Sequence, residues 1–550
     1  MPVPIDEPRY SLLTEPWIKV VMNDNTIQQF GLLDFFENIN GISSLIVDAD
    51  MEDPALFRLF LAIVYRALDP VLEDDWFDWW ESNELPVDRI IRYLNDHEDE
   101  FWLYHPSKPF LQTMIEPKDD ATGAIKDLGC LIAEPTGNDF GSNRSSSKVH
   151  TLGDDETARR LIASLQYDRS AAHASYKGCV DEKQNKVYAT RAYLGGMSTI
   201  RLKTGNMFKD ILLSLIPLDS GLFDDSVVNG ANGLTAGTPL WEIGSISFDG
   251  NGTGKEPLHA KTVEEALVWP SRRIRLFTMS NGTTGTLISS GRHVSMEDSD
   301  GIEPMAAFYN FQEKKNAPIH KLPVQARPDK SFWRSLTSLT IADGNTPPMT
   351  LKWASELRQD GYLETSSVGN VTVITTRYDA TNASKVTSVL SDSVSLPIEL
   401  IENMRYANEI AFAIRYAEAI VRYYRDLLIG IGMAKGDRNA LTNKGKPNFS
   451  YRESQISLVY DAIGEEFYKW VLELPNEEDD STMMESWADS VEGIVKKSIA
   501  SDVSESPLSA LLGRRVMQDK NETIYSIAGA LNDFERKVRF HRKKELNNEQ

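Results

Sequence analysis

The stretch after Pro397 constrains the fold of this chain more than any other feature. Within residues 401–432, apolar side chains recur at alternating spacings of four and three, at Ile410, Ile414, Ala417, Val421, Tyr424 and Leu428. Such a stripe lines one face of a long helix and is typical of helix bundles. Three further helical patterns follow, at roughly residues 450–474, 482–502 and 521–545. We therefore predict a C-terminal four-helix bundle.

The residues before the bundle predict a different kind of domain. Strand, turn and helix patterns alternate from residue 11 to residue 36, and helical patterns occupy residues 53–70 and 156–168. Two β-branched stretches around the polar tip 379–384 predict a hairpin. A chain of 550 residues is also too long for one core. We predict an α+β fold, with a large mixed α/β domain at 1–395 and a four-helix bundle at 396–550.

Charge and cysteine content exclude several classes of protein. Lys plus Arg number 58 against 81 Asp plus Glu, a net charge of −23, so contact with nucleic acid requires local basic patches. Cys130 and Cys179 are too few for a disulfide framework and lack partners at zinc spacing, which predicts a cytoplasmic protein. The first residues lack the pattern of a signal peptide, and no run of 18 apolar residues occurs, so we expect no membrane span.

Several segments have the composition of such patches. Residues 137–148, GNDFGSNRSSSK, form a polar loop whose donors suit phosphate or sugar oxygens, although most loops of this kind carry no function. Basic residues also gather at 272–275, at 311–330 and at 536–544. Each of these can equally be a solvated face, and the sequence leaves both interpretations open.

A search for catalytic chemistry finds no recognisable site. The chain lacks a nucleophile elbow, an HExxH motif, a CxxC pair, a complete phosphate loop and a glycine-rich dinucleotide turn. The stretch FDGNGTGKE at 248–256 resembles a phosphate loop and a calcium loop but completes neither, and a hairpin turn is the better interpretation. We therefore expect no catalytic residue, no metal and no cofactor. An enzyme with an unrecognised site and a helical appendage remains the alternative, and a purely structural scaffold is a third.

A series of short motifs, taken in order, resembles one protein family. The matching pieces are SLLTEPWIKV, HPSKPFLQT, the 137–148 loop followed by LIASLQYDRS, AYLGG with LLSLIPL, TPLWE, LVWPSRRIRL, EPMAAF, KSFWRSL and SLPIEL. They cover most of residues 8–400 in the right order. The chain thus resembles the CasA family, the large subunits of the type I-E CRISPR surveillance complex called Cascade.

The resemblance implies a function in antiviral defence. It implies a non-enzymatic DNA-binding subunit at one end of an RNA-guided complex, which reads a protospacer-adjacent motif (PAM) in double-stranded DNA. Such a subunit wedges the duplex open so that guide RNA pairs with the target strand, and it helps recruit an effector helicase-nuclease. The implied partners are target DNA, CRISPR guide RNA, the other Cascade subunits and that helicase-nuclease. Minor-groove readers that distort a duplex, with base pairing supplying sequence specificity, fit this role physically.

The resemblance also assigns candidate nucleic-acid contacts. The family's wedge, an amide followed by Ala-Ser, falls beside Thr381 on Asn382, Ala383 and Ser384, where this chain has Asn in place of the usual, longer Gln. The loop that meets the guide RNA and the PAM falls on 137–148, and its candidate residues are Phe140, Asn143 and Arg144.

Three further positions complete the implied DNA-facing surface. The family's minor-groove loop falls on residues 170–178, where this chain offers Ala171, Ala172 and Lys177. Its minor-groove lysine falls near residues 289–292, where Arg292 is the candidate substitute. A basic pair on the same surface matches Lys314 and Lys315.

Overall fold

The computed structural model describes residues 2–118, 124–132, 151–179, 183–184, 186–243, 257–327, 330–364, 368–378, 386–442, 446–476, 480–504, 506–518 and 521–547. The chain divides into two compact units. The first consists of Met1–Asp329 and Gly344–Ser393, and the second of Lys330–Asp343 and Val394–Gln550. Each unit is therefore built from two separate pieces of the chain.

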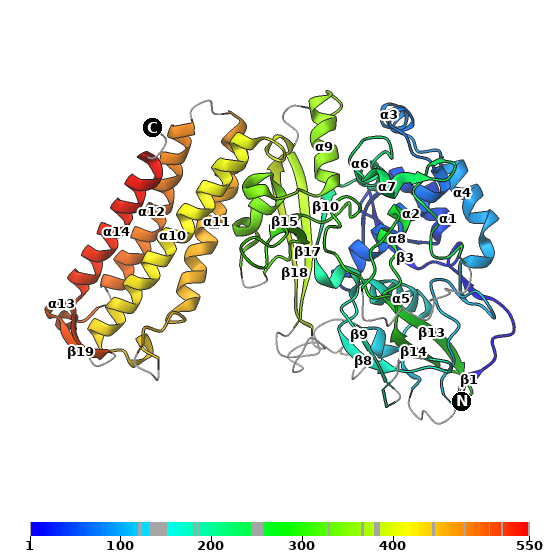
Figure 1. Ribbon diagram of the computed structural model, residues 1–550, viewed down its shortest axis with the longest axis horizontal. Helices are drawn as coiled ribbons and strands as arrows, with labels where there is room; N and C mark the ends of the chain where they lie inside the picture. The colour runs from blue at the N-terminus through cyan, green and yellow to red at the C-terminus, as the bar shows by residue number, and fades with distance from the viewer. Residues whose placement is uncertain are drawn as a thin grey trace. The chain divides into compact units, whose positions relative to one another are not determined.

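The first unit mixes short helices with small antiparallel sheets (Figure 1). Its helices are α1 (Leu32–Glu37), α2 (Glu52–Leu68), α3 (Glu73–Ser82), α4 (Val87–Asp96), α5 (Asp154–Tyr167), α6 (Met207–Ser214), α7 (Asp225–Val228), α8 (Val263–Leu267) and α9 (Met349–Gln359). Its strands up to β9 are β1 (Pro2–Val3), β2 (Arg9–Ser11), β3 (Ile18–Met22), β4 (Ile27–Phe30), β5 (Ile42–Leu45), β6 (Trp102–Tyr104), β7 (Lys126–Asp127), β8 (Ala171–Ala174) and β9 (Lys186–Ala189).

The later strands follow the same pattern. They are β10 (Ser198–Lys203), β11 (Asn229–Gly230), β12 (Gly233–Leu234), β13 (Arg272–Met279), β14 (Thr284–Ser290), β15 (Phe308–Phe311), β16 (His320–Pro323), β17 (Val368–Tyr378) and β18 (Val386–Pro397). The larger sheets have the strand orders β1-β13-β14-β7, β10-β17-β18 and β4-β3-β5. Helices and strands thus intermingle along the first unit, and the predicted α+β class is confirmed.

Helix α2 forms the centre of the first unit's core. Its residues are buried nearly all round, as expected of a helix that other elements surround. It packs against α4, α5 and α8. Even its arginine is enclosed: Arg58 makes two hydrogen bonds to the carboxylate of Glu303, at 2.7 and 2.9 Å, and neither side chain is exposed. Arg58 also donates to the carbonyl oxygen of Ala266, which ties α2 to α8.

The sheet that contains β13 and β14 supports the region of most interest for function. β13 pairs with β14 in antiparallel register from Arg272↔Ser290 to Thr278↔Thr284. The hairpin of β8 and β9 lies against β14, beside this sheet (Figure 1). Residues 168–178 were expected to form a loop, but Ala171–Ala174 is a strand, because it gains a complete antiparallel partner in β9.

The second unit is dominated by four long helices that lie side by side (Figure 1). They are α10 (Met404–Lys435), α11 (Glu453–Glu473), α12 (Asp480–Ser504) and α14 (Ile527–Asn547). α10 and α12 contact each other, and each also contacts α11 and α14. The stripe predicted on α10 is buried, from Ile410 to Leu428.

A short helix and a hairpin interrupt the bundle before its last helix. They are α13 (Leu508–Leu512) and the paired strands β19 (Arg514–Gln518) and β20 (Asn521–Tyr525). The prediction of one helix over residues 521–545 is therefore wrong at its start. The β-branched residues Thr523 and Ile524 pair with Val516 and Arg515, and α14 begins only at Ile527.

The second unit also takes in a segment from before residue 395. Residues 332–339 form a 3-10 helix whose Trp333 packs its ring against Phe467 of α11, with 5.1 Å between the ring centroids. A Cβ added to Gly464 would come within 2.8 Å of the Trp333 indole, so only glycine admits the ring at that position. In the part of the chain that is described, no helix is long and apolar enough to cross a lipid bilayer.

Candidate nucleic-acid interface

One buried guanidinium holds the base of the β8–β9 hairpin. Arg272, at the start of β13, donates from Nε to Oδ2 of Asp168 at 2.6 Å. Its Nη2 donates to the carbonyl oxygens of Arg169 at 2.8 Å and Thr190 at 2.6 Å, which lie on the two sides of the hairpin. Because a guanidinium has five donors in a fixed plane, a single side chain can join both sides.

Asp168 is the anionic partner of this clamp. Burial alone would raise the pKa of its carboxyl, but the charges of Arg272 and His173 outweigh it and hold the pKa well below the usual range. His173 Nε2 lies 3.2 Å from the same carboxylate oxygen. The basic stretch 272–275 is therefore not a solvated face: Arg272 and Arg273 are buried, and Arg275 pairs with Glu116.

The outward face of the hairpin joins small, basic and aromatic side chains. In β9 exposure alternates, so that Lys186 and Tyr188 face outward while Val187 and Ala189 face inward. Tyr188 is 66% exposed, and its cross-strand partner is the exposed Ala172. The two alanines predicted as contacts, Ala171 and Ala172, point to opposite faces of the hairpin, as successive residues of a strand do. Ala171 pairs with Ala189 and shares its inward side.

The segment after β8 carries a further exposed cation. Lys177 is exposed, and its backbone N–H donates to the carbonyl oxygen of Glu116 at 2.8 Å. Gly178 follows with φ +85° and open space where a side chain would stand. Together, Ala172, Lys177, Lys186 and Tyr188 are called the hairpin face below.

Arg292 lies near this hairpin, but its side chain is engaged elsewhere. The neighbouring His293 is hydrogen bonded to the backbone of Tyr188 in β9. The guanidinium of Arg292 instead lies 3.3 Å from Glu265 Oε1 and over the ring of Trp269. The side chains of Arg292 and Glu265 are 27% and 25% exposed. An anion that binds the Arg292 guanidinium must therefore compete with the carboxylate of Glu265.

Lys314 and Lys315 lie on another hairpin, formed by β15 and β16. Both are exposed in the turn after β15, where Ala317 N donates to the carbonyl oxygen of Lys314. Among the described residues neither has an ion-pair partner. Tyr309 and Phe311 of β15 are 39% and 40% exposed and precede this turn. The rest of the predicted 311–330 patch is neutralised, since Lys321 pairs with Asp300 and Lys330 with Glu418.

The basic residues of α14 are also largely paired. Lys537 lies 3.0 Å from Asp426, Arg542 lies 2.6 Å from Asp489, and Arg536 lies 2.6 Å from Asp533. These contacts join α14 to α10 and α12 or lie within α14 itself. They give this charge run a structural role in the bundle.

Two sets of predicted contacts lie outside the described residues. Phe140, Asn143 and Arg144 belong to residues 133–150, and Thr381, Asn382 and Ala383 belong to residues 379–385. The strands that flank the second set are described: β17 ends at Tyr378, β18 begins at Val386, and the two are neighbours in one sheet. The stretch 248–256 also lies outside the described residues.

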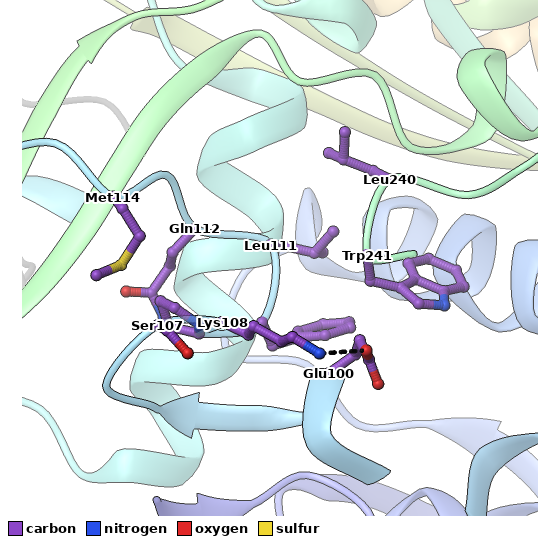
Figure 2. Close-up of a pocket in the computed structure, with 10 residues that line it drawn as sticks. Glu100, Ser107, Lys108, Leu111, Gln112, Met114, Leu240 and Trp241 are labelled. Atoms are coloured by element: carbon purple, nitrogen blue, oxygen red, sulfur yellow. Dashed lines mark hydrogen bonds and ion pairs between the residues drawn. The ribbon is translucent and has the colours of Figure 1, made fainter. Parts of the chain in front are cut away.

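The segments HPSKPFLQT and TPLWE line a common pocket. Figure 2 shows Leu240 and Trp241 on one side and Lys108, Leu111 and Gln112 on the other. Lys108 Nζ is 3.2 Å from Glu100 Oε1, so the charges at the rim neutralise each other. His105 accepts the backbone N–H groups of Ser107 and Lys108, a structural role that leaves Nδ1 no free lone pair for catalysis. The hydroxyl of Ser107 lies 3.5 Å from the same nitrogen, which already accepts the two backbone N–H groups.

Comparison with known proteins identifies the family. A family model described as CRISPR-associated protein Cse1 matches residues 11–498. The chain belongs to the CRISPR-associated Cse1 family. The CasA/Cse1 protein of Thermus thermophilus is 25% identical over 418 residues, which cover 73% of this chain and 75% of that protein.

Solved structures of Cse1 proteins share the fold over nearly the whole chain. The Cse1 structure from Thermobifida fusca matches with a TM-score of 0.79 and 22% identity, covering 98% of both chains. A chain of a solved CRISPR RNA-guided surveillance complex matches with a TM-score of 0.61 and 16% identity, covering 90% of this chain and 99% of that one.

Sequence reasoning missed several exposed residues of this Cse1 family member. Lys186 and Tyr188 were not singled out, although the alternation in Lys-Val-Tyr-Ala is the signal of a half-buried strand and was available. Tyr309 and Phe311, which precede Lys314 and Lys315, were not singled out either. In both hairpins the aromatic groups lie on the strands, whereas the prediction looked for contacts in loops.

Proposed function

We propose that this chain is the non-catalytic large subunit of an RNA-guided CRISPR surveillance complex of type I-E. In this proposal it recognises the PAM in double-stranded DNA, wedges the duplex open and helps recruit the effector helicase-nuclease. Membership of the Cse1 family supports the proposal, as does the likeness to a chain of a CRISPR RNA-guided surveillance complex. Its setting is the cytoplasm, and its partners are target DNA, guide RNA and the other subunits of the complex.

The hairpin face is the observation that carries the proposal. A protein of net charge −23 repels DNA over most of its surface, so a duplex contact requires local cations that are free of acidic partners. Lys177 and Lys186 are exposed on this face, and neither forms an ion pair with another described residue. Ala172 and Gly178 between them leave room for a sugar-phosphate chain to approach the backbone.

The wedge is proposed for residues 381–383, which lie in the sequence between β17 and β18. Both strands belong to the β10-β17-β18 sheet, where six pairs join β10 to β17 from Ser198↔Thr375 to Lys203↔Asn370. A position between two neighbouring strands of a sheet suits a wedge, because a rigid base can transmit the force of duplex distortion. Asn382 is the proposed inserted amide, and Phe140, Asn143 and Arg144 are proposed contacts to guide RNA and PAM.

Reconstitution of the guide-RNA complex with and without this chain tests the function. Binding is measured on duplexes that carry the protospacer with either an intact or a scrambled flanking motif. We expect tight binding only when both the chain and the motif are present. Equal binding of both duplexes by the complete complex would show that the chain does not read the motif. A complex that binds equally well without the chain would reduce it to a scaffold.

A further inference from the structure

Three metal-ligating side chains converge beside the β15–β16 hairpin, away from the hairpin face. Glu297 and Asp298 precede the segment 299–303, and His320 is the first residue of β16. His320 Nδ1 lies 2.7 Å from Glu297 Oε1 and 2.9 Å from Asp298 Oδ2. One donor atom from each side chain lies within 4.8 Å of the other two. Such separations allow one ion to contact all three.

One nitrogen faces two carboxylate oxygens in this cluster. Nδ1 of an imidazole carries at most one hydrogen, so the two oxygens at hydrogen-bond distance share it. A divalent ion in place of that proton would accept a lone pair from all three atoms at once.

The ligands are held in place by backbone contacts. The N–H of Asp298 donates to the carbonyl oxygen of Lys321 at 2.8 Å, and the N–H of Lys321 donates to Asp298 Oδ1 at 2.7 Å. This pair of bonds occupies Oδ1 and aims Oδ2 at His320. The nearest ammonium, that of Lys321, pairs with Asp300 and so does not neutralise the cluster.

We propose that Glu297, Asp298 and His320 bind a divalent transition-metal ion of the Zn²⁺ class. Imidazole nitrogen with carboxylate oxygen is a donor set that suits Zn²⁺, whereas Mg²⁺ favours oxygen ligands and retained water. All three side chains are at least 38% exposed, so water completes the coordination. The ion would fasten the start of β16 to the segment that holds Glu297 and Asp298.

Calorimetric titration of the metal-free full-length chain with ZnCl₂ tests the site. We expect saturable binding of one ion and no comparable binding of MgCl₂. His320→Gln and Glu297→Gln should each weaken Zn²⁺ binding by at least roughly tenfold, the loss expected when a ligand is removed from a site. Anomalous scattering at the zinc edge from soaked crystals should place the ion between the three side chains.

Glu313→Gln is the matched control, because Glu313 is an exposed glutamate on the same hairpin but outside the cluster. It should bind Zn²⁺ as the unmodified chain does. Binding that His320→Gln leaves unchanged would overturn the assignment, and so would the absence of saturable binding. Circular dichroism of each variant shows that it is folded, so a loss of binding is not mistaken for unfolding.

Discussion

Arg272 and Asp168 are joined by a 2.6 Å bond from Nε to Oδ2 at the base of the β8–β9 hairpin. Arg272→Lys keeps the charge but loses the planar donors that reach Arg169 and Thr190. We expect the free energy of unfolding to fall by about 2 kcal/mol, because buried carbonyl oxygens lose their partners. Amide hydrogen exchange should quicken in β8 and β9 before other strands. Arg275 lies on the same strand but pairs with the exposed Glu116. Arg275→Lys should therefore lower the free energy of unfolding by less than about 1 kcal/mol.

Charge reversal at Lys314 and Lys315 should weaken duplex binding by the assembled complex. Two phosphate contacts contribute about two counterions, so the slope of log K against log salt should fall by about 2. The double substitution Lys314→Glu with Lys315→Glu is measured by fluorescence anisotropy at several salt concentrations. Lys209→Glu with Lys261→Glu makes the same change of charge on α6 and before α8. If both variants lose affinity equally, the effect is one of net charge.

Tyr188→Ala should reduce target binding with little effect on folding, since the ring is exposed. Loss of stacking on a base or sugar would cost about 1–3 kcal/mol, or roughly tenfold or more in affinity. Lys186→Ala should instead lower affinity on all sequences alike and reduce the salt slope by about 1. Phe449→Ala removes a ring of 63% exposure in the second unit and serves as the control. Unchanged affinity in Tyr188→Ala would remove this residue from the interface.

Asn382→Ala should impair strand opening more than assembly. The subunit should still join the complex, because the proposed role of Asn382 is confined to the separated duplex. Permanganate reactivity of unpaired thymines measures opening, and size-exclusion chromatography measures assembly. Asn382→Gln restores the longer amide of related proteins and should open DNA at least as well as the unmodified chain. Normal opening by Asn382→Ala would contradict the wedge.

Glu264→Gln should stabilise the first unit at neutral pH. Glu264 is 1% exposed, and neither carboxylate oxygen has a hydrogen-bond partner among the residues that the structure describes. Burial raises its pKa well above the ordinary 4.5; Arg66 opposes this shift, and Asp69 and Glu242 reinforce it. The unfolded chain releases this proton above about pH 4.5, whereas the folded chain retains it, so folding becomes less favourable as pH rises.

The free energy of unfolding of Glu264→Gln should therefore rise relative to that of the unmodified chain between pH 5 and pH 8. The difference should grow by up to about 1.4 kcal/mol per pH unit while Glu264 stays protonated in the folded state. Thermal unfolding at several pH values measures the difference. Glu265→Gln, the adjacent and more exposed glutamate, should not show this trend. Parallel pH profiles for Glu264→Gln and the unmodified chain would mean that Glu264 titrates normally.

Local periodicity made much of the fold predictable. The stripe from Ile410 to Leu428 specifies a helix because each apolar residue falls on one face, whatever its partners are. The same holds for the strands that became β17 and β18. The direction of a charged side chain cannot be predicted in this way. Nothing near Arg272 in the sequence shows that its side chain donates hydrogen bonds to Asp168 and Thr190. Hence a run that reads as a basic surface proved to be buried.

The candidate interface was predictable only in part, for the same reason. Lys177, Lys314 and Lys315 are exposed as expected, whereas Arg292 is turned toward Glu265. Tyr188 is a candidate contact because it lies across the hairpin from the exposed Ala172, and only the strand pairing shows that the two are neighbours. Likewise, β20 was predicted as the start of a helix because five residues are too few to show a strand period clearly.

Trp333 belongs to the first of the two pieces of the second unit, which has a consequence for synthesis and for fragment design. The ribosome releases Trp333 long before the helix with Gly464 and Phe467 exists, so the indole has no packing partner on that helix during this part of translation. A recombinant bundle beginning at residue 394 would lack this ring, and Phe467 would keep only its contacts within the bundle, such as those with Trp470 and Trp487. Adding residues 330–343 as a separate peptide should restore order to such a fragment.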